Sequence, residues 1–246
     1  MVVVILSFII SAIKIIFLLG FLVLIHESGH FFVAKLCKVR VNEFAIGFGP
    51  IIWKKQGKVT MYAIRAIPLG GFVNMEGEGE RSTKQGSFSE AHILKRIAIV
   101  MAGGLVNIIF AIVLFWCLSA CYVGIENAFY NVIHFIKSMF QSIIQIFTGK
   151  VTVDQMMGPV GISSVVSQTN GISEFIYILS LISLSLGVTN LLPFPPLDGG
   201  KIVLLIIEGI REKPFNEKFE IGLQSAGFLL LILLSLFVTY NDILKL

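Results

Sequence analysis

Four long apolar segments, separated by more polar ones, dominate this chain of 246 residues. They occupy residues 2–34, 97–122, 175–192 and 221–240. Each is long enough to cross a bilayer as a helix, because the hydrocarbon core needs roughly 17 to 25 apolar residues. The pattern predicts an all-α integral membrane protein with four transmembrane helices, folded as a single domain over residues 1–246.

Two shorter segments have other patterns. Residues 59–75 alternate imperfectly between polar and apolar and contain Pro68–Gly71, which predicts a β-hairpin with a tight bend. The hairpin is rather apolar, so it is either a small solvated hairpin or one that re-enters the membrane beside a protein cavity. In the second case its edge can hold an extended peptide by strand addition. Residues 129–148 have apolar positions at helical spacing, which predicts an amphipathic helix in the outer membrane interface.

Composition supports the membrane class. Only 14% of the residues are charged and 56% are hydrophobic, whereas about a quarter of the residues in soluble domains are charged. The net charge of +4 is modest and gives no indication of nucleic-acid binding. Three cysteines without a metal-site pattern predict no disulfide framework. We expect the first apolar segment to remain as a span, since no basic stretch precedes it.

The basic residues indicate an orientation. Eleven of the nineteen lie between the first two apolar segments, at Lys35, Lys38, Arg40, Lys54, Lys55, Lys58, Arg65, Arg81, Lys84, Lys95 and Arg96. Loops rich in lysine and arginine stay in the cytoplasm. The pattern therefore predicts an N-terminus outside the cell and a cytoplasmic loop at residues 35–96.

A His-Glu-x-x-His motif ends the first apolar segment, at residues 26–30. His26 and His30 share one face of a helix and can bind one Zn²⁺, while Glu27 is placed to act as a general base. The motif is short and also occurs by chance. However, a charge at membrane depth costs at least a few kcal/mol, and a metal would offset that cost. Such a site needs a third protein ligand.

Asp198 is the natural third ligand. It follows a segment with three prolines, residues 193–196, which cannot form a regular helix. Broken backbone at membrane depth is expected where it lines a cavity. The alternative is that Asp198 merely caps the next helix. A second cytoplasmic loop is expected over residues 201–218. In the second segment Gly103 and Gly104 allow close helix approach. Asn107, one turn later, is either structural or orients a substrate backbone.

The two motifs together, His-Glu-x-x-His at 26–30 and Asn-x-x-Pro-x-Pro-x-x-Asp-Gly at 190–199, resemble those of the site-2 protease family of intramembrane zinc metalloproteases. Within that family the chain resembles the bacterial regulator-of-sigma-E protease branch. Supporting stretches are Gly47–Pro50, Ile67–Val73 and Met157–Gly161.

The resemblance implies zinc held by His26, His30 and Asp198, with Glu27 as the catalytic base. It implies substrate contacts at Asn190 and, less directly, at Asn107, because the family's proline is replaced by Gly104. It identifies residues 59–75 as a membrane-reentrant hairpin, in which Gly70 and Gly71 are candidate substrate contacts.

The implied reaction is peptide hydrolysis in or near the transmembrane helices of single-span membrane proteins, within the bacterial cell membrane. Anti-sigma factors, transcription regulators and signal-peptide remnants are examples of such substrates. Many relatives carry PDZ domains between the second and third spans, where the 52 residues from 123 to 174 leave no room for one here. A transporter with the same ligands is the alternative, although no inverted repeat is evident. A catalytically silent scaffold is a third reading. The sequence makes no prediction of oligomeric state.

Overall fold

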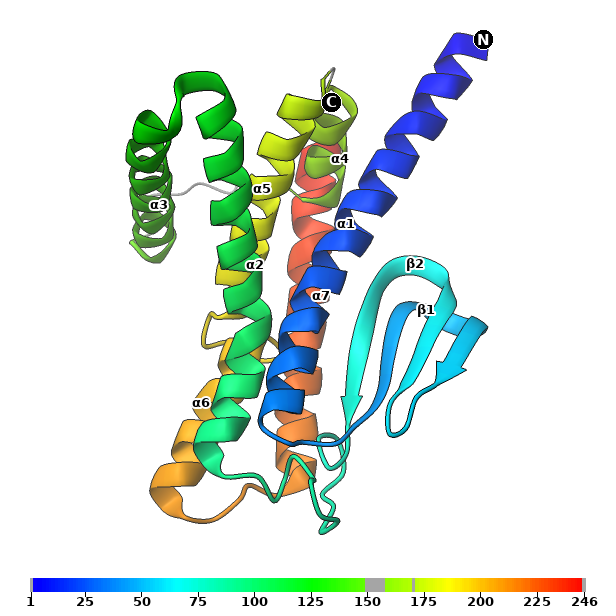
Figure 1. The fold of residues 1–246 in the computed structure, drawn as a ribbon, viewed down its shortest axis with the longest axis vertical. Coiled ribbons are helices and arrows are strands. Elements are labelled where there is room, and N and C mark those ends of the chain that lie inside the picture. The colour runs from blue at the N-terminus through cyan, green and yellow to red at the C-terminus, as the bar shows by residue number, and fades with distance from the viewer. Residues whose placement is uncertain (1, 149–157, 170, 245–246) are drawn as a thin grey trace. The chain divides into compact units, whose positions relative to one another are not determined.

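The computed structural model describes residues 2–148, 158–169 and 171–244 (Figure 1). Helices make up most of these residues. In chain order the elements are α1 (Val2–Leu36), β1 (Val41–Gln56), β2 (Met61–Met75), α2 (Ile93–Val123), α3 (Ile125–Phe147), α4 (Pro159–Ser167), α5 (Ile172–Asn190), α6 (Asp198–Arg211) and α7 (Glu217–Leu244).

Four of these helices, within the described residues, are long and apolar enough to cross a membrane: Ile9–Leu36, Ile93–Val123, Ile172–Asn190 and Glu217–Leu244. They coincide with the four apolar segments, so the prediction of four such helices is confirmed. Helix α3 covers the predicted amphipathic segment. Met157, the first residue of one quoted stretch, lies outside the described residues.

The chain divides into two compact units. The unit that we call the sheet unit comprises Ile16–Ile108 and Ser185–Phe228. The other, the α3 unit, comprises Met1–Ile15, Ile109–Leu184 and Leu229–Leu246. Long helices such as α1 and α2 contribute residues to both units.

In the α3 unit, buried polar groups are paired with each other. Lys14 Nζ donates hydrogen bonds to the carbonyl oxygen of Thr169 at 2.8 Å and to its hydroxyl at 3.1 Å. Asp242 Oδ2 accepts from the backbone N–H groups of Gly158 and Gly161, at 2.9 and 2.8 Å, where α4 begins. A carboxylate at a helix N-terminus satisfies donors that have no partner within the helix. These contacts are structural.

The sheet unit contains an antiparallel pair, β1 and β2, in which separate segments of one strand pair with the same segment of the other. Residues 41–46 of β1 pair both with 71–75 and with 61–64 of β2, and residues 51–56 pair with 61–65. The segment 71–75 therefore has one paired side and, among the described strands, one unpaired side. Both strands bend back on themselves.

The predicted hairpin over residues 59–75 is wrong in its extent. Its turn was expected at Pro68–Gly71, but those residues lie inside β2, and the strand that pairs with β2 is β1. Glycines let a strand bend without ending it, and Gly47 and Gly49 adopt φ of +87° and +81° where β1 bends. The fold is thus mostly helical with a small sheet rather than all-α.

A second difference concerns residues 201–218, where a loop was expected. Residues 198–211 instead form α6. Leu205 explains the difference, because it is 3% exposed and joins Ala34, Val41 and Ile99 in one apolar core. This core links the end of α1, both strands, the start of α2 and α6, and it holds the elements that carry the candidate site.

Candidate metal centre

Three side chains from two distant parts of the sheet unit converge. His26 Nε2 lies 3.1 Å from His30 Nε2, and Asp198 Oδ2 lies 3.1 Å and 3.3 Å from these two nitrogens. Both histidines are buried. Among the described residues this is the group of histidine, cysteine and acidic side chains that could hold a metal ion.

The local fold explains the convergence. His26 and His30 are four residues apart on α1, so their side chains leave the helix on one face. After α5 ends at Asn190, the chain turns tightly and α6 begins with Asp198. Gly199 permits this turn, because a Cβ atom there would overlap the carbonyl oxygens of Leu191 and Leu192.

The backbone of α2 orients one imidazole. His30 Nδ1 lies 2.8 Å from the carbonyl oxygen of Ile99. A carbonyl oxygen only accepts, so Nδ1 carries the proton and Nε2 of the neutral ring keeps its lone pair. That lone pair is directed at His26 and Asp198. A hydrogen bond on the far nitrogen is the usual support for a histidine that binds metal.

Two asparagines lie beside the other imidazole. The Nδ2 atoms of Asn107 and Asn190 are 3.5 and 3.4 Å from His26 Nδ1. The nitrogen and oxygen of an amide are assigned from their surroundings, so either amide can present its oxygen to a protonated Nδ1. Both asparagines were predicted to contact substrate. The structure places them where they can orient His26, and the substrate contact stays a prediction.

Glu27 is the residue next to His26 on α1 and is partly exposed. It lies close enough to interact electrostatically with His30, His26 and Asp198. Successive helix residues diverge by about 100°, so Glu27 flanks the three-atom cluster instead of joining it. This is a suitable position for a base that acts beside a metal.

Sequence reasoning missed how Gly103 contributes. It predicted close helix approach at this position, and Gly29 does lie against the carbonyl of Ala102. However, Gly103 itself faces the site, because a Cβ atom there would overlap the rings of His26 and His30. The only signal in the sequence is a glycine in an apolar helix, which does not identify what lies opposite.

Gly70 and Gly71, the remaining predicted site residues, are not part of the cluster. Both are buried in β2, where Gly71 pairs with Ile46 and Gly70 lies against the ring of Phe48. Nearby, the carbonyl oxygen of Pro68 would be 2.7 Å from a Cβ atom on Gly20. Gly20 precedes His26 by six residues, or about 9 Å along the helix. The strand β2 therefore runs beside α1 near the site (Figure 1).

The three converging atoms fit zinc. Ligands bonded at about 2.0–2.1 Å in a tetrahedron are about 3.3 Å apart, close to the 3.1, 3.1 and 3.3 Å between these atoms. The buried Asp198 Oδ2 has no well-aligned hydrogen-bond donor among the described residues. A carboxylate oxygen and an imidazole lone pair in such proximity call for a cation between them.

Comparison with known proteins agrees with this chemistry. Residues 14–234 match the family described as peptidase family M50. A protein of Fusobacterium nucleatum named "putative zinc metalloprotease" is 28% identical over 93% of this chain and 97% of its own length. A Clostridium acetobutylicum protein with the same description is 28% identical over 91% and 94%.

The zinc metalloprotease RasP of Shouchella clausii is 44% identical over 116 residues, which are 46% of this chain and 28% of RasP. The alignment with the Fusobacterium protein extends over 333 positions, so that relative has residues which this chain of 246 lacks. Because the family match covers most of the chain and includes both motifs, the resemblance to the site-2 proteases is confirmed. The chain belongs to peptidase family M50.

Proposed function

We propose that this member of family M50 is an intramembrane zinc endopeptidase, with His26, His30 and Asp198 as zinc ligands and Glu27 as the catalytic base. One observation carries the proposal. Two imidazoles and a carboxylate, 172 positions apart in the chain at the extremes, meet within 3.3 Å beside a glutamate, and the histidines lie in a helix suited to cross a membrane. An ordinary surface ion pair does not need three such groups buried together in a helix of this kind.

Zinc bound there supplies Lewis-acid chemistry, which makes a water more acidic and polarises the carbonyl to be cleaved. The side chains of this chain do the rest. Asp198 and the two imidazoles offer three protein ligands, the number found in catalytic zinc sites, which keep a further position open. Ile99 fixes the tautomer of His30 through its carbonyl oxygen.

Glu27 transfers the protons in the reaction. Its carboxylate accepts a proton from the attacking water and donates it to the nitrogen of the departing amine, so one side chain serves as base and then as acid. Its place beside the ligands, with electrostatic interactions to His30, His26 and Asp198, supports this role. The peptide bond breaks and one water is consumed.

The substrates we propose are single-span membrane proteins in the lipid bilayer. A helix hides its carbonyl groups in its own hydrogen bonds, so a transmembrane helix has to unwind before hydrolysis. The side of β2 at residues 71–75 that pairs with none of the described strands offers backbone groups to which an unwound segment can add as a strand. Gly71 begins this segment and Gly70 directly precedes it. Asn107 and Asn190 are further candidate contacts, beside His26.

We further propose that the chain works as one peptidase domain without a PDZ domain, in a bacterial cell membrane. The excess of basic residues between the first two spans favours a cytoplasmic location for the sheet and for the opening of the site, with the N-terminus outside. Helix α3 is then an interfacial helix on the outer side, consistent with its amphipathic pattern.

The test is co-expression of the full chain with tagged single-span proteins, comparing wild type with Glu27→Gln. Wild type should release a shortened fragment. The variant should release at least a hundredfold less, while its zinc content stays the same. Equal cleavage by both proteins would refute the role of Glu27. Zinc flux into vesicles without any cleavage would instead favour the transporter alternative.

A further inference from the structure

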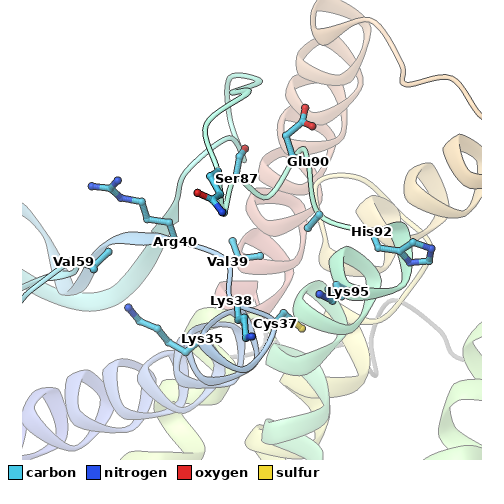
Figure 2. A pocket seen from close by; sticks show the side chains of 13 residues that line it. Lys35, Cys37, Lys38, Val39, Arg40, Val59, Ser87, Glu90, His92 and Lys95 are labelled. Carbon is cyan, nitrogen blue, oxygen red and sulfur yellow. The ribbon is translucent and has the colours of Figure 1, made fainter.

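A cavity in the sheet unit is lined by none of the residues of the metal centre. It has a volume of about 640 Å³ and lies where α1 ends and α2 begins. Figure 2 shows that its lining side chains come from the end of α1, the residues leading into β1, the turn between β1 and β2, the segment before α2 and the start of α2.

The lining is strongly cationic. It includes Lys35, Lys38, Arg40 and Lys95 but a single carboxylate, that of Glu90. All five side chains are exposed. Lys38, Arg40 and Lys95 make no ion pair with any residue that the structure describes, and Lys35 donates one hydrogen bond, to the Thr60 hydroxyl, out of the three it can make. The cavity therefore carries uncompensated positive charge.

His92 adds a further donor. Its Nδ1 accepts a hydrogen bond from the backbone N–H of Leu94 at 3.3 Å. A neutral imidazole that accepts through Nδ1 carries its proton on Nε2. His92 lies directly before α2, whose N-terminal end favours negative charge. An anion with several acceptor oxygens fits this set of donors.

Neighbouring apolar residues indicate what carries the anion. Leu36 is 80% exposed and lies between the lining residues Lys35 and Cys37, and Leu94 is 66% exposed beside Lys95. Both lie at the ends of helices that are long and apolar enough to cross a membrane. Exposed apolar side chains next to cations suit a molecule with a charged head and hydrocarbon chains more than a free ion.

We propose that this cavity binds the phosphate-bearing headgroup of an anionic phospholipid. Lys38, Arg40 and Lys95 contact the phosphate oxygens, with Lys35 and His92 at the sides. The acyl chains extend along the exposed apolar residues of α1 and α2. The site is separate from the proposed zinc chemistry and does not depend on it.

The test uses the full chain purified in detergent and titrated with phosphatidylglycerol, with bound lipid counted by native mass spectrometry. Phosphatidylcholine serves as the lipid without net charge, and inorganic phosphate as the soluble anion. Wild type should bind one phosphatidylglycerol at least tenfold more tightly than phosphatidylcholine. Inorganic phosphate that displaces the lipid at comparable concentration would overturn the assignment to a lipid.

The variant Lys38→Gln, Arg40→Gln, Lys95→Gln should weaken phosphatidylglycerol binding by roughly a hundredfold, since each cation near a lipid surface contributes about fivefold. A matched control, Lys54→Gln, Lys55→Gln, Lys58→Gln, removes the same charge from β1 and the turn after it, at three residues that do not line the cavity, and should stay within about twofold of wild type. Equal loss in both variants, or loss in neither, would refute the site. Lys95→Gln alone, with an expected loss of about fivefold, decides the question if the triple variant does not fold.

Discussion

His30 Nδ1 donates a hydrogen bond to the carbonyl oxygen of Ile99, at 2.8 Å. This contact ties an imidazole of α1 to the backbone of α2. It fixes which nitrogen of His30 is free to face His26 and Asp198. The position of α2 against α1 therefore determines the geometry of the site, although α2 provides no candidate ligand. The two helices approach closely at Gly29 of α1 and Gly103 of α2, which have no side chain.

Gly103→Ala tests that dependence. The new methyl group would overlap both imidazole rings, so the rings or α2 must move. A displacement of about 1 Å at reacting groups can cost a hundredfold in rate. We expect catalytic efficiency to fall by about a hundredfold and zinc affinity by about tenfold, measured by cleavage of a model span and by competition with a chelator.

The matched control for this variant is Gly222→Ala. Gly222 lies in α7, and no atom would come within 4 Å of a Cβ atom there. Alanine is the better helix former, so activity should be unchanged and the protein slightly more stable. Full activity of Gly103→Ala would show that the imidazoles do not need the space above Gly103.

Asn107→Ala and Asn190→Ala should each weaken zinc binding by about tenfold, because each removes an amide beside His26. Titration with a zinc-buffered indicator measures this directly, without substrate. If instead the asparagines only contact substrate, zinc affinity stays at the wild-type value and the Michaelis constant alone rises.

The ion pair of Lys201 with Glu78, at 2.6 Å, connects α6 to the segment after β2. Lys201 lies one helical turn after Asp198. Lys201→Gln and Glu78→Gln should each destabilise the protein by about 1 kcal/mol, and the double variant by less than their sum. A double-mutant cycle from thermal unfolding gives the coupling. Strict additivity would show that the pair contributes nothing.

Glu76 gives the protein an acid-sensitive contact. Its carboxylate accepts hydrogen bonds from the side chains of Asn42 and Ser82 and pairs with Lys84. These contacts lower the pKa of Glu76 from 4.5 to about 2. The carboxylate is thus more acidic when folded, so its contribution is complete above pH 4.5 and is lost as the pH falls toward 2.

We therefore expect Glu76→Gln to show a smaller fall in melting temperature than wild type between pH 4.5 and pH 2, measured by light scattering or calorimetry. Glu80→Gln is the control, since Glu80 makes no ion pair with the residues that the structure describes, and it should follow wild type. Identical pH profiles for wild type and Glu76→Gln would contradict the assignment.

Sequence patterns predicted the parts of the structure that follow from the spacing of residues along the chain. Hydropathy located the four long helices, and the spacing of His26 and His30 put both on one face of α1. The approach of Asp198 was predicted because prolines had to break the chain before it. These inferences need only local rules or a motif that combines two distant segments.

The parts that were missed depend on contacts that leave no local signature. The carbonyl of Ile99 is a backbone group that any residue would present. From the sequence, Gly103 is an ordinary packing glycine, and only the structure shows that the imidazoles of His26 and His30 lie opposite it. β2 continues through Pro68–Gly71, which was interpreted as a turn between two strands. Residues 201–218 were interpreted as a loop because of their basic residues, yet α6 extends to Arg211.

The most direct measurement of the central claim is the zinc content of purified Asp198→Ala beside wild type and Glu27→Gln, after dialysis against a chelator. Wild type and Glu27→Gln should each keep about one zinc per chain, whereas Asp198→Ala should lose it at least a hundredfold more readily. Zinc held by Asp198→Ala as tightly as by wild type would contradict the proposal that the carboxylate of α6 completes the site on α1.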